Sequence, residues 1–204
     1  MNIIKQLTVY CGSNFGETPA YYQAAKALGN HLAKHDITLV YGGGNVGLMG
    51  AIADSVLTNQ GKAIGVIPQF LADKEVAHTG LTELIFTPDM ATRKSKLIEL
   101  GDAFIALPGG IGTFEELFEV LSLAQLRQHK KPIGVLNIDG FFDPLLDLLH
   151  RTADSGFMPT QNLNLLCVAD DIDELFAKMH AYQFVESQKW VKPAWLDTLE
   201  IPKF

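Results

Sequence analysis

The chain alternates short runs of β-branched and aromatic residues with longer segments in which apolar residues recur at helical spacing. Several short runs are apolar throughout, as expected for parallel strands that are covered on both faces. The longer segments have the period of amphipathic helices. Strands are predicted over residues 6–10, 37–41, 63–67, 84–87, 103–107, 132–136 and 165–168, and helices over 19–35, 47–59, 90–100, 113–128, 143–155 and 171–185.

The alternation of strands and helices predicts right-handed βαβ units and therefore an α/β fold. We expect a doubly wound, Rossmann-like, mostly parallel sheet of about seven strands with helices on both faces. No linker rich in Pro, Gly or Ser divides the sequence, so residues 1–185 are predicted to form a single domain. Residues 186–204 lose the periodicity but contain both tryptophans, and we expect them to pack on this domain or on a partner subunit.

The 204 residues carry 16 Lys and Arg against 23 Asp and Glu, a formal net charge of −7. Nucleic acids and anionic membranes attract basic surfaces, so this balance argues against both as partners. A small anion remains possible, because backbone amides and one or two cations suffice to bind a phosphate. The two cysteines are too few for a disulfide framework, and neither a signal peptide nor a membrane-spanning run is present. We therefore expect a cytoplasmic protein.

Glycine-rich turns follow three of the predicted strands, at residues 11–13, 42–50 and 108–113. Ligands of such sheets collect at the carboxyl ends of the strands, so the first two turns predict an anion site that includes Gly12, Ser13, Gly43 and Gly44. Neither long turn is a Walker A motif, and the acidic residue of a dinucleotide fold is missing after the third strand. The turns therefore favour a pocket for a mononucleotide or a sugar phosphate.

Two motifs make the sequence recognisable. Residues 108–116 read PGGIGTFEE, and residues 90–94 read MATRK. Together with GGGNVGLMG at residues 42–50, they resemble the PGGxGTxxE and MxxRK signatures of the Lonely Guy family, the cytokinin riboside 5′-monophosphate phosphoribohydrolases. The resemblance extends from residue 6 to residue 185.

This resemblance implies hydrolysis of the N-glycosidic bond of adenosine 5′-monophosphate (AMP) and of N6-substituted riboside 5′-monophosphates, releasing the free base and ribose 5-phosphate. It implies catalytic roles for Arg93 and Glu116, and a homodimer with the site near the interface. Neither a metal nor a cofactor is expected. The substrate-binding positions that the resemblance implies are Glu75, Lys94, Gly109, Gly110, Ile111, Gly112, Thr113, Phe114, Glu115 and Ser122.

The chemistry gives these residues distinct roles. N-riboside cleavage passes through an oxocarbenium-like state, so the site needs a carboxylate near the anomeric carbon. In a helix that begins at Thr113, Glu116 lies in the first turn, where the helix dipole is expected to keep its carboxylate ionised. The amides of that turn suit the phosphate. Arg93 is expected to orient the substrate and balance charge, because a guanidinium does not give up its proton.

Structural alternatives exist for each of these residues. Thr113-x-x-Glu116 is also a capping box, in which the glutamate only satisfies a free backbone amide. Arg93 and Lys94 could be ordinary solvated charges on a helix, and Glu75 a surface charge in a loop.

Two other functions compete with hydrolysis. A nucleotide carrier or sensor would use the same glycine turns without requiring the Arg93–Glu116 pair. A lysine decarboxylase, a label often given to this family, would need pyridoxal phosphate on a Schiff-base lysine. Lys94 stands in a charged helix with no evident aldehyde pocket. Residues 73–78 read DKEVAH where plant members usually carry PREVTG, so the sequence leaves the preferred N6 substituent open.

Overall fold

The computed structural model describes residues 2–75 and 77–186, with side chains for all of these except 73–75. Most of the predicted 186–204 tail therefore lies outside the described residues. Seven parallel strands form one sheet in the order β4-β3-β2-β1-β5-β6-β7. The predicted α/β fold is confirmed. The strands are β1 (Gln6–Tyr10), β2 (Thr38–Tyr41), β3 (Ala63–Pro68), β4 (Glu83–Thr87), β5 (Ala103–Ala106), β6 (Ile133–Leu136) and β7 (Leu166–Ala169).

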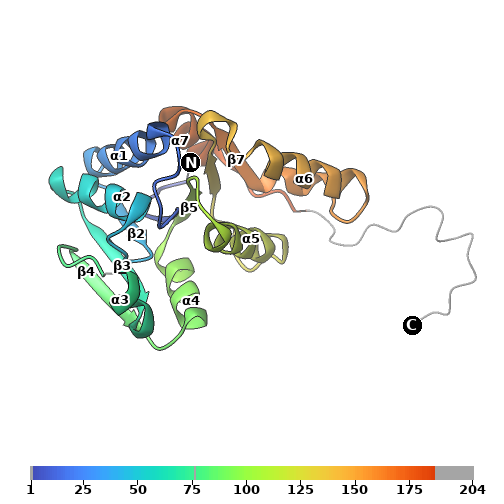
Figure 1. Cartoon of the computed structure of the whole chain (residues 1–204). Helices are drawn as coiled ribbons and strands as arrows, with labels where there is room; N and C mark the ends of the chain where they lie inside the picture. Colours follow the sequence, from blue (N-terminus) through green and yellow to red (C-terminus); the bar gives the residue numbers. More distant parts are fainter. Residues whose placement is uncertain (1, 76, 187–204) are drawn as a thin grey trace, which may run out of the picture.

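Helices connect the strands and cover the sheet (Figure 1). Six of them correspond to predicted segments, whereas α3 was not predicted, since seven residues are too few to display a helical period. The α-helices are α1 (Pro19–Lys34), α2 (Gly47–Thr58), α3 (Gln69–Glu75), α4 (Met90–Leu100), α5 (Ile111–Gln125), α6 (Asp143–Asp154) and α7 (Ile172–Ala181), and two short 3₁₀ turns span Ile138–Gly140 and Thr160–Leu165.

Two apolar layers hold the helices against the sheet. One layer joins the sheet to α1, α2 and α7 through residues such as Leu28, Ile52 and Leu175, all buried. The other joins the opposite face to α4 and α5 through Leu97 and Leu117. Burial on both faces explains why the strands read as continuous apolar runs. Within the described residues, no helix is long and apolar enough to cross a membrane.

The strand order places a topological switch beside β1. The chain builds β2, β3 and β4 outward on one side of β1, then returns to add β5, β6 and β7 on the other side. Connections that leave neighbouring strands in opposite directions open a crevice at the strands' carboxyl ends. The turns after β1 and β5 face each other across this crevice, and one of them is PGGIGT.

Candidate active site

The three glycine turns pack against one another. The amide of Gly12 donates to the carbonyl of Pro108 at 3.1 Å, and the amide of Leu48 donates to the carbonyl of Gly12 at 3.0 Å. A Cβ at Gly109 would collide with the backbone amide of Gly12, and one at Gly47 with the backbone of Ser13. Glycine is therefore required where these turns touch.

A cavity of about 210 Å³ opens between these turns and the N-termini of α4 and α5. Its walls combine backbone from the turns with side chains that include those of Met49 and Met90. The lining residues are Cys11, Gly12, Ser13, Met49, Met90, Arg93, Gly110, Ile111, Gly112, Thr113, Glu115 and Glu116. Both predicted catalytic residues thus share one cavity, although they are 23 positions apart in the sequence.

Other predicted site residues do not line this cavity. Gly109 lines a neighbouring hollow of about 170 Å³, together with Phe15 and Tyr21. Phe114 packs its ring against Phe141 at a centroid distance of 6.2 Å. Of the remaining predicted residues, Gly43 lies against β3, and Gly44 forms a β-bridge with Ala77. Glu75 is the last residue of α3, and its side chain is not among those that the structure describes. Lys94 takes part in ion pairs, and Ser122 lines an apolar groove.

Arg93 is buried, with 7% of its surface exposed. Its Nε donates to the carbonyl of Val66 at 3.1 Å, and its Nη2 donates to the carbonyl of Gly42 at 3.3 Å. A Cβ on Gly42 would collide with the guanidinium, so that glycine makes room for it. The alternative of a solvated helix charge is wrong for Arg93. The carbonyls near the ends of β2 and β3 instead hold its charged guanidinium at the wall of the cavity.

Helix α5 begins two residues earlier than predicted. Gly110 is its N-cap, and Ile111 is its first helical residue. Thr113 is therefore already inside the helix and cannot cap it, which excludes the capping box with Glu116. Gly110 adopts the extended conformation of an N-cap and offers no side chain to the free amides. Since no described side chain caps the helix start, these amides can donate to an anion in the cavity.

No contact among the described residues requires glycine at the start of α5. Within this part of the chain, a Cβ at Gly110 or Gly112 would meet nothing within 4 Å, unlike one at Gly109. Glycine at these positions instead lets a ligand approach the backbone closely. Thr113, 4% exposed, stands behind them at the same helix end. The arrangement suits a phosphate, which favours the positive end of the helix dipole.

Glu116 faces the inner side of α5, on the same helical face as buried Thr113 and Val120. Burial raises the pKa of its carboxyl to about 7, opposed by the Arg93 guanidinium and reinforced by the negative charges of Glu115 and Glu119. The expectation that the helix dipole keeps this carboxylate ionised is wrong, because Glu116 lies in the second turn and desolvation dominates there. A carboxyl with this pKa can both give and take a proton near neutral pH.

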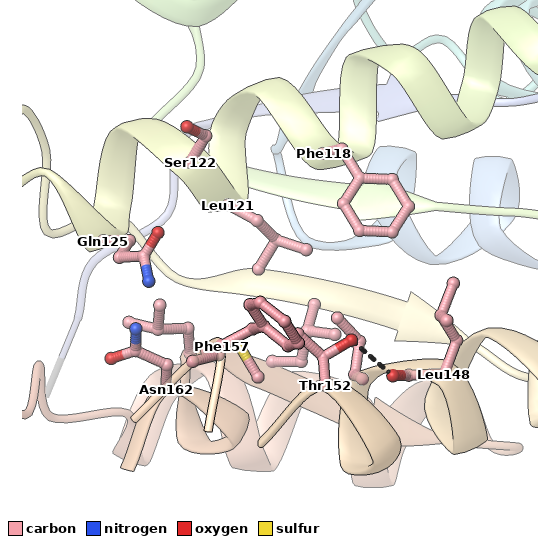
Figure 2. Close-up of a pocket in the computed structure, with 12 residues that line it drawn as sticks. Phe118, Leu121, Ser122, Gln125, Leu148, Thr152, Phe157 and Asn162 are labelled. Atoms are coloured by element: carbon pink, nitrogen blue, oxygen red, sulfur yellow. Dashed lines mark hydrogen bonds between the residues drawn. The ribbon is translucent and has the colours of Figure 1, made fainter. Parts of the chain in front are cut away.

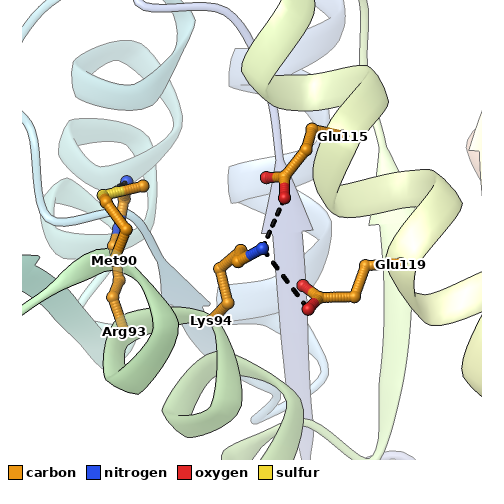
Figure 3. Close-up of polar contacts among 5 residues, drawn as sticks. All are labelled: Met90, Arg93, Lys94, Glu115 and Glu119. Carbon is orange, nitrogen blue, oxygen red and sulfur yellow. Dashed lines mark hydrogen bonds and ion pairs between the residues drawn. The ribbon is translucent and has the colours of Figure 1, made fainter.

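An ion-pair cluster borders the cavity (Figure 3). The Lys94 ammonium contacts the carboxylate of Glu115 and lies 3.4 Å from that of Glu119, one turn further along α5. The hydrogen bond that Lys94 donates to Glu115 raises the pKa of Lys94 above its usual value. Sequence reasoning missed Glu119, although its spacing of four from Glu115 is the signal for a shared helical face.

An apolar groove of about 280 Å³ runs between α5 and α6 (Figure 2). Phe118, Leu148 and Phe157 are exposed along it, and Phe157 has 85% of its surface free. Ser122 lies in this groove rather than in the cavity. Among the described residues, no group of three or more His, Cys, Asp or Glu is arranged to hold a metal ion.

Comparison with known proteins places this chain in a family. A family model described as "Possible lysine decarboxylase" matches residues 49–179. The cytokinin riboside 5′-monophosphate phosphoribohydrolase LOG7 of Arabidopsis thaliana is 41% identical over 179 residues, 88% of this chain and 82% of the relative. The chain belongs to the Lonely Guy family. The cytokinin riboside 5′-monophosphate phosphoribohydrolase of Rhodococcoides fascians is 44% identical over 178 residues, 87% of this Lonely Guy chain and 90% of the relative.

Solved structures share the fold of this Lonely Guy chain. The molybdenum cofactor binding protein of Rippkaea orientalis has a TM-score of 0.63 and 23% identity, covering 86% of this chain and 95% of its own. A molybdenum cofactor carrier protein of Chlamydomonas reinhardtii has a TM-score of 0.65 and 21% identity, covering 86% and 96%. At such identities the likeness is one of fold, and function must be argued from the site.

The raised pKa of Glu116 predicts a pH-dependent cost to stability. Its carboxyl titrates near 4.5 in the unfolded chain and at about 7 in the folded one, so folding loses stability as the pH rises between these values. We expect Glu116→Gln to raise the melting temperature by roughly 7–14 °C at pH 8, where the cost is fully present, and by almost nothing at pH 4.5. Calorimetry at both pH values checks this, and a lower melting temperature for the variant at pH 8 would contradict it.

Proposed function

We propose that this chain hydrolyses the N-glycosidic bond of AMP and of N6-substituted (cytokinin) riboside 5′-monophosphates, giving the free base and ribose 5-phosphate. The observation that carries the proposal is the Glu116 carboxyl, with its pKa of about 7, in one cavity with buried Arg93 and the free amides of α5. The names of the relatives support the same reaction class.

In the proposed reaction the 5′-phosphate binds the amides of Gly110 to Thr113, which directs the ribose toward Glu116. As the bond from C1′ to the base breaks, its electron pair leaves with the base, and Glu116 donates a proton to a base nitrogen. The resulting carboxylate then faces the oxocarbenium ion and takes a proton from the attacking water, which restores the acid. Arg93 is the counter-charge for the transient carboxylate.

The state of Lys94 disfavours lysine decarboxylation. A Schiff-base lysine attacks as the neutral amine, which requires a lowered pKa. Glu115 and Glu119 instead hold Lys94 as an ammonium, with a raised pKa. Its chemistry fits the binding of an anion better than nucleophilic attack.

A carrier is disfavoured by the cost of burying Glu116. Binding a nucleotide needs backbone amides that hold the phosphate and one or two cations, and the glycine turns together with Arg93 supply these without a carboxyl. A buried carboxyl that destabilises the fold at neutral pH is typical of a catalytic acid or base.

Replacement of Glu116 separates hydrolysis from binding. We expect Glu116→Gln to lower AMP cleavage at least about a hundredfold, because glutamine neither donates the proton nor opposes the oxocarbenium charge. Binding of AMP should persist, since the amides of α5 are unchanged. Chromatography of adenine and ribose 5-phosphate, with calorimetric titration of AMP, measures both. A Glu116→Gln variant that keeps most of the activity would show that Glu116 is not the catalytic acid, and Glu115→Gln would then be the variant to examine.

The placement of the phosphate predicts discrimination against nucleosides. Hydrogen bonds to a charged group contribute about 1.5–3 kcal/mol each, so losing two or three of them should cost at least a hundredfold in kcat/KM. We therefore expect adenosine to be cleaved at least about a hundred times less efficiently than AMP. Comparable kcat/KM values for the two substrates would place the phosphate elsewhere.

We further propose that the chain forms a homodimer through the groove between α5 and α6. The groove is apolar and carries exposed aromatic rings, which in an isolated domain mark an interaction surface. Ser122, which the family resemblance assigns to the substrate, lies in this groove. A second copy seated there would bring it between the two subunits.

Light scattering tests the dimer. We expect about twice the chain mass of 22.4 kDa at micromolar concentration, and the mass of one chain for Phe157→Glu, which introduces a charge into the groove. Phe70→Glu is the matched control, because Phe70 is exposed on α3 and outside the groove. A wild-type chain that scatters as a monomer would refute the proposal.

A further inference from the structure

Lys94 stands between two carboxylates that occupy successive turns of α5 (Figure 3). Glu115 lines the cavity, whereas Glu119 lies one turn further along the helix and is not among the lining residues. Both carboxylates belong to the same helical face, because they are four residues apart. Glu116 follows Glu115 by one residue and is therefore rotated by about 100° toward the inner face.

The titratable groups around Glu116 come from three elements, of which two carry charge. Helix α4 supplies Arg93 and Lys94, and α5 supplies Glu115 and Glu119. The end of β1 supplies Tyr10 and Cys11, whose pKa values are raised by burial, so both side chains stay neutral. Three carboxyl groups of α5 thus meet two cations of α4, and the position of Lys94 decides how that balance acts on Glu116.

Glu115 alone would be an unreliable partner for Lys94. Its carboxylate faces the cavity, where an incoming phosphate competes for the same ammonium. A lysine released from Glu115 has several rotatable bonds and can swing toward any nearby anion, Glu116 included. The second carboxylate, 3.4 Å away and outside the cavity, retains the ammonium on the outer face of α5.

We propose that Glu119 is a positioning residue that anchors Lys94 on the outer face of α5 and so keeps its ammonium from pairing with Glu116. The inference rests on the proposed function, in which Glu116 must be able to donate a proton. Glu119 acts in two ways that reinforce each other, because its own negative charge and its retention of Lys94 both favour the protonated form of Glu116.

Titration of Glu116 tests the inference without using activity. In protein labelled with ¹³C-carboxyl glutamate, the signal that Glu116→Gln removes identifies Glu116, and its shift against pH gives the midpoint. We expect a midpoint near 7 for the wild type and one about one pH unit lower for Glu119→Gln. Glu119→Asp keeps the charge and should stay close to the wild type. Glu99→Gln is the matched control, since Glu99 pairs with Lys96 on α4 at 3.0 Å and should leave the midpoint unchanged.

Lys94→Met should shift the titration midpoint of Glu116 in the opposite direction. Removing the ammonium leaves only carboxylates beside Glu116 on the outer side, so its midpoint should rise. Identical midpoints for Glu119→Gln and the wild type, or a midpoint that falls in Lys94→Met, would overturn the inference.

The pH profile of AMP cleavage then connects titration to function. In Glu119→Gln, the alkaline limb of kcat should move to lower pH by the same interval as the titration midpoint of Glu116. KM should change less than kcat. If the wild type cleaves no nucleotide, the proposed function fails while the titration still decides the role of Glu119. If the titration midpoint of Glu116 falls in Glu119→Gln but the alkaline limb of kcat stays where it is in the wild type, Glu119 affects only the titration of Glu116. That result would overturn its role in the reaction.

Discussion

The site depends on one constraint, the close approach of three backbone turns at the carboxyl edge of the sheet. Because the strands are parallel, their ends lie on the same edge, and the reversal of strand order beside β1 brings the turns after β1, β2 and β5 together. Gly12 and Gly47 bring backbone to backbone there, with the hydrogen bond from Leu48 to Gly12 joining two of the turns. Side chains at these glycines would push the turns apart and open the crevice to water.

Closing that crevice has an electrostatic consequence. Arg93 fits over Gly42, where carbonyls near the ends of β2 and β3 accept hydrogen bonds from the guanidinium. Glu116 lines the same cavity as Arg93, and desolvation outweighs its attraction to the guanidinium, so its pKa rises. The cost of a partly buried acid is thus a direct result of the packing of the glycine turns. A site on an open surface would leave the same glutamate ionised at neutral pH.

The sequence predicted the sheet better than the start of α5. Uninterrupted apolar runs are a strong signal, and β1 was predicted to the residue. Thr113 looked like a cap, because a threonine three residues before a glutamate is a strong local pattern. Gly110 takes that position instead, since the turn must pack on Gly12 and present its amides to the cavity. The raised pKa of Glu116 and the place of Ser122 depend on tertiary burial, which spacing along the chain does not encode.

Helix α5 shows how one element meets several demands at once. Its N-terminus offers amides to an anion, and Glu116 projects from the face that it shares with buried Thr113 and Val120. A second face carries the carboxylates that pair with Lys94, and a third presents Phe118 and Ser122 to the groove. These faces lie within 15 residues, so the helix cannot rotate or slide to suit one of them without disturbing the others. Apolar and acidic residues are distributed around α5 in no simple amphipathic pattern. This distribution follows from the separate demands on its faces.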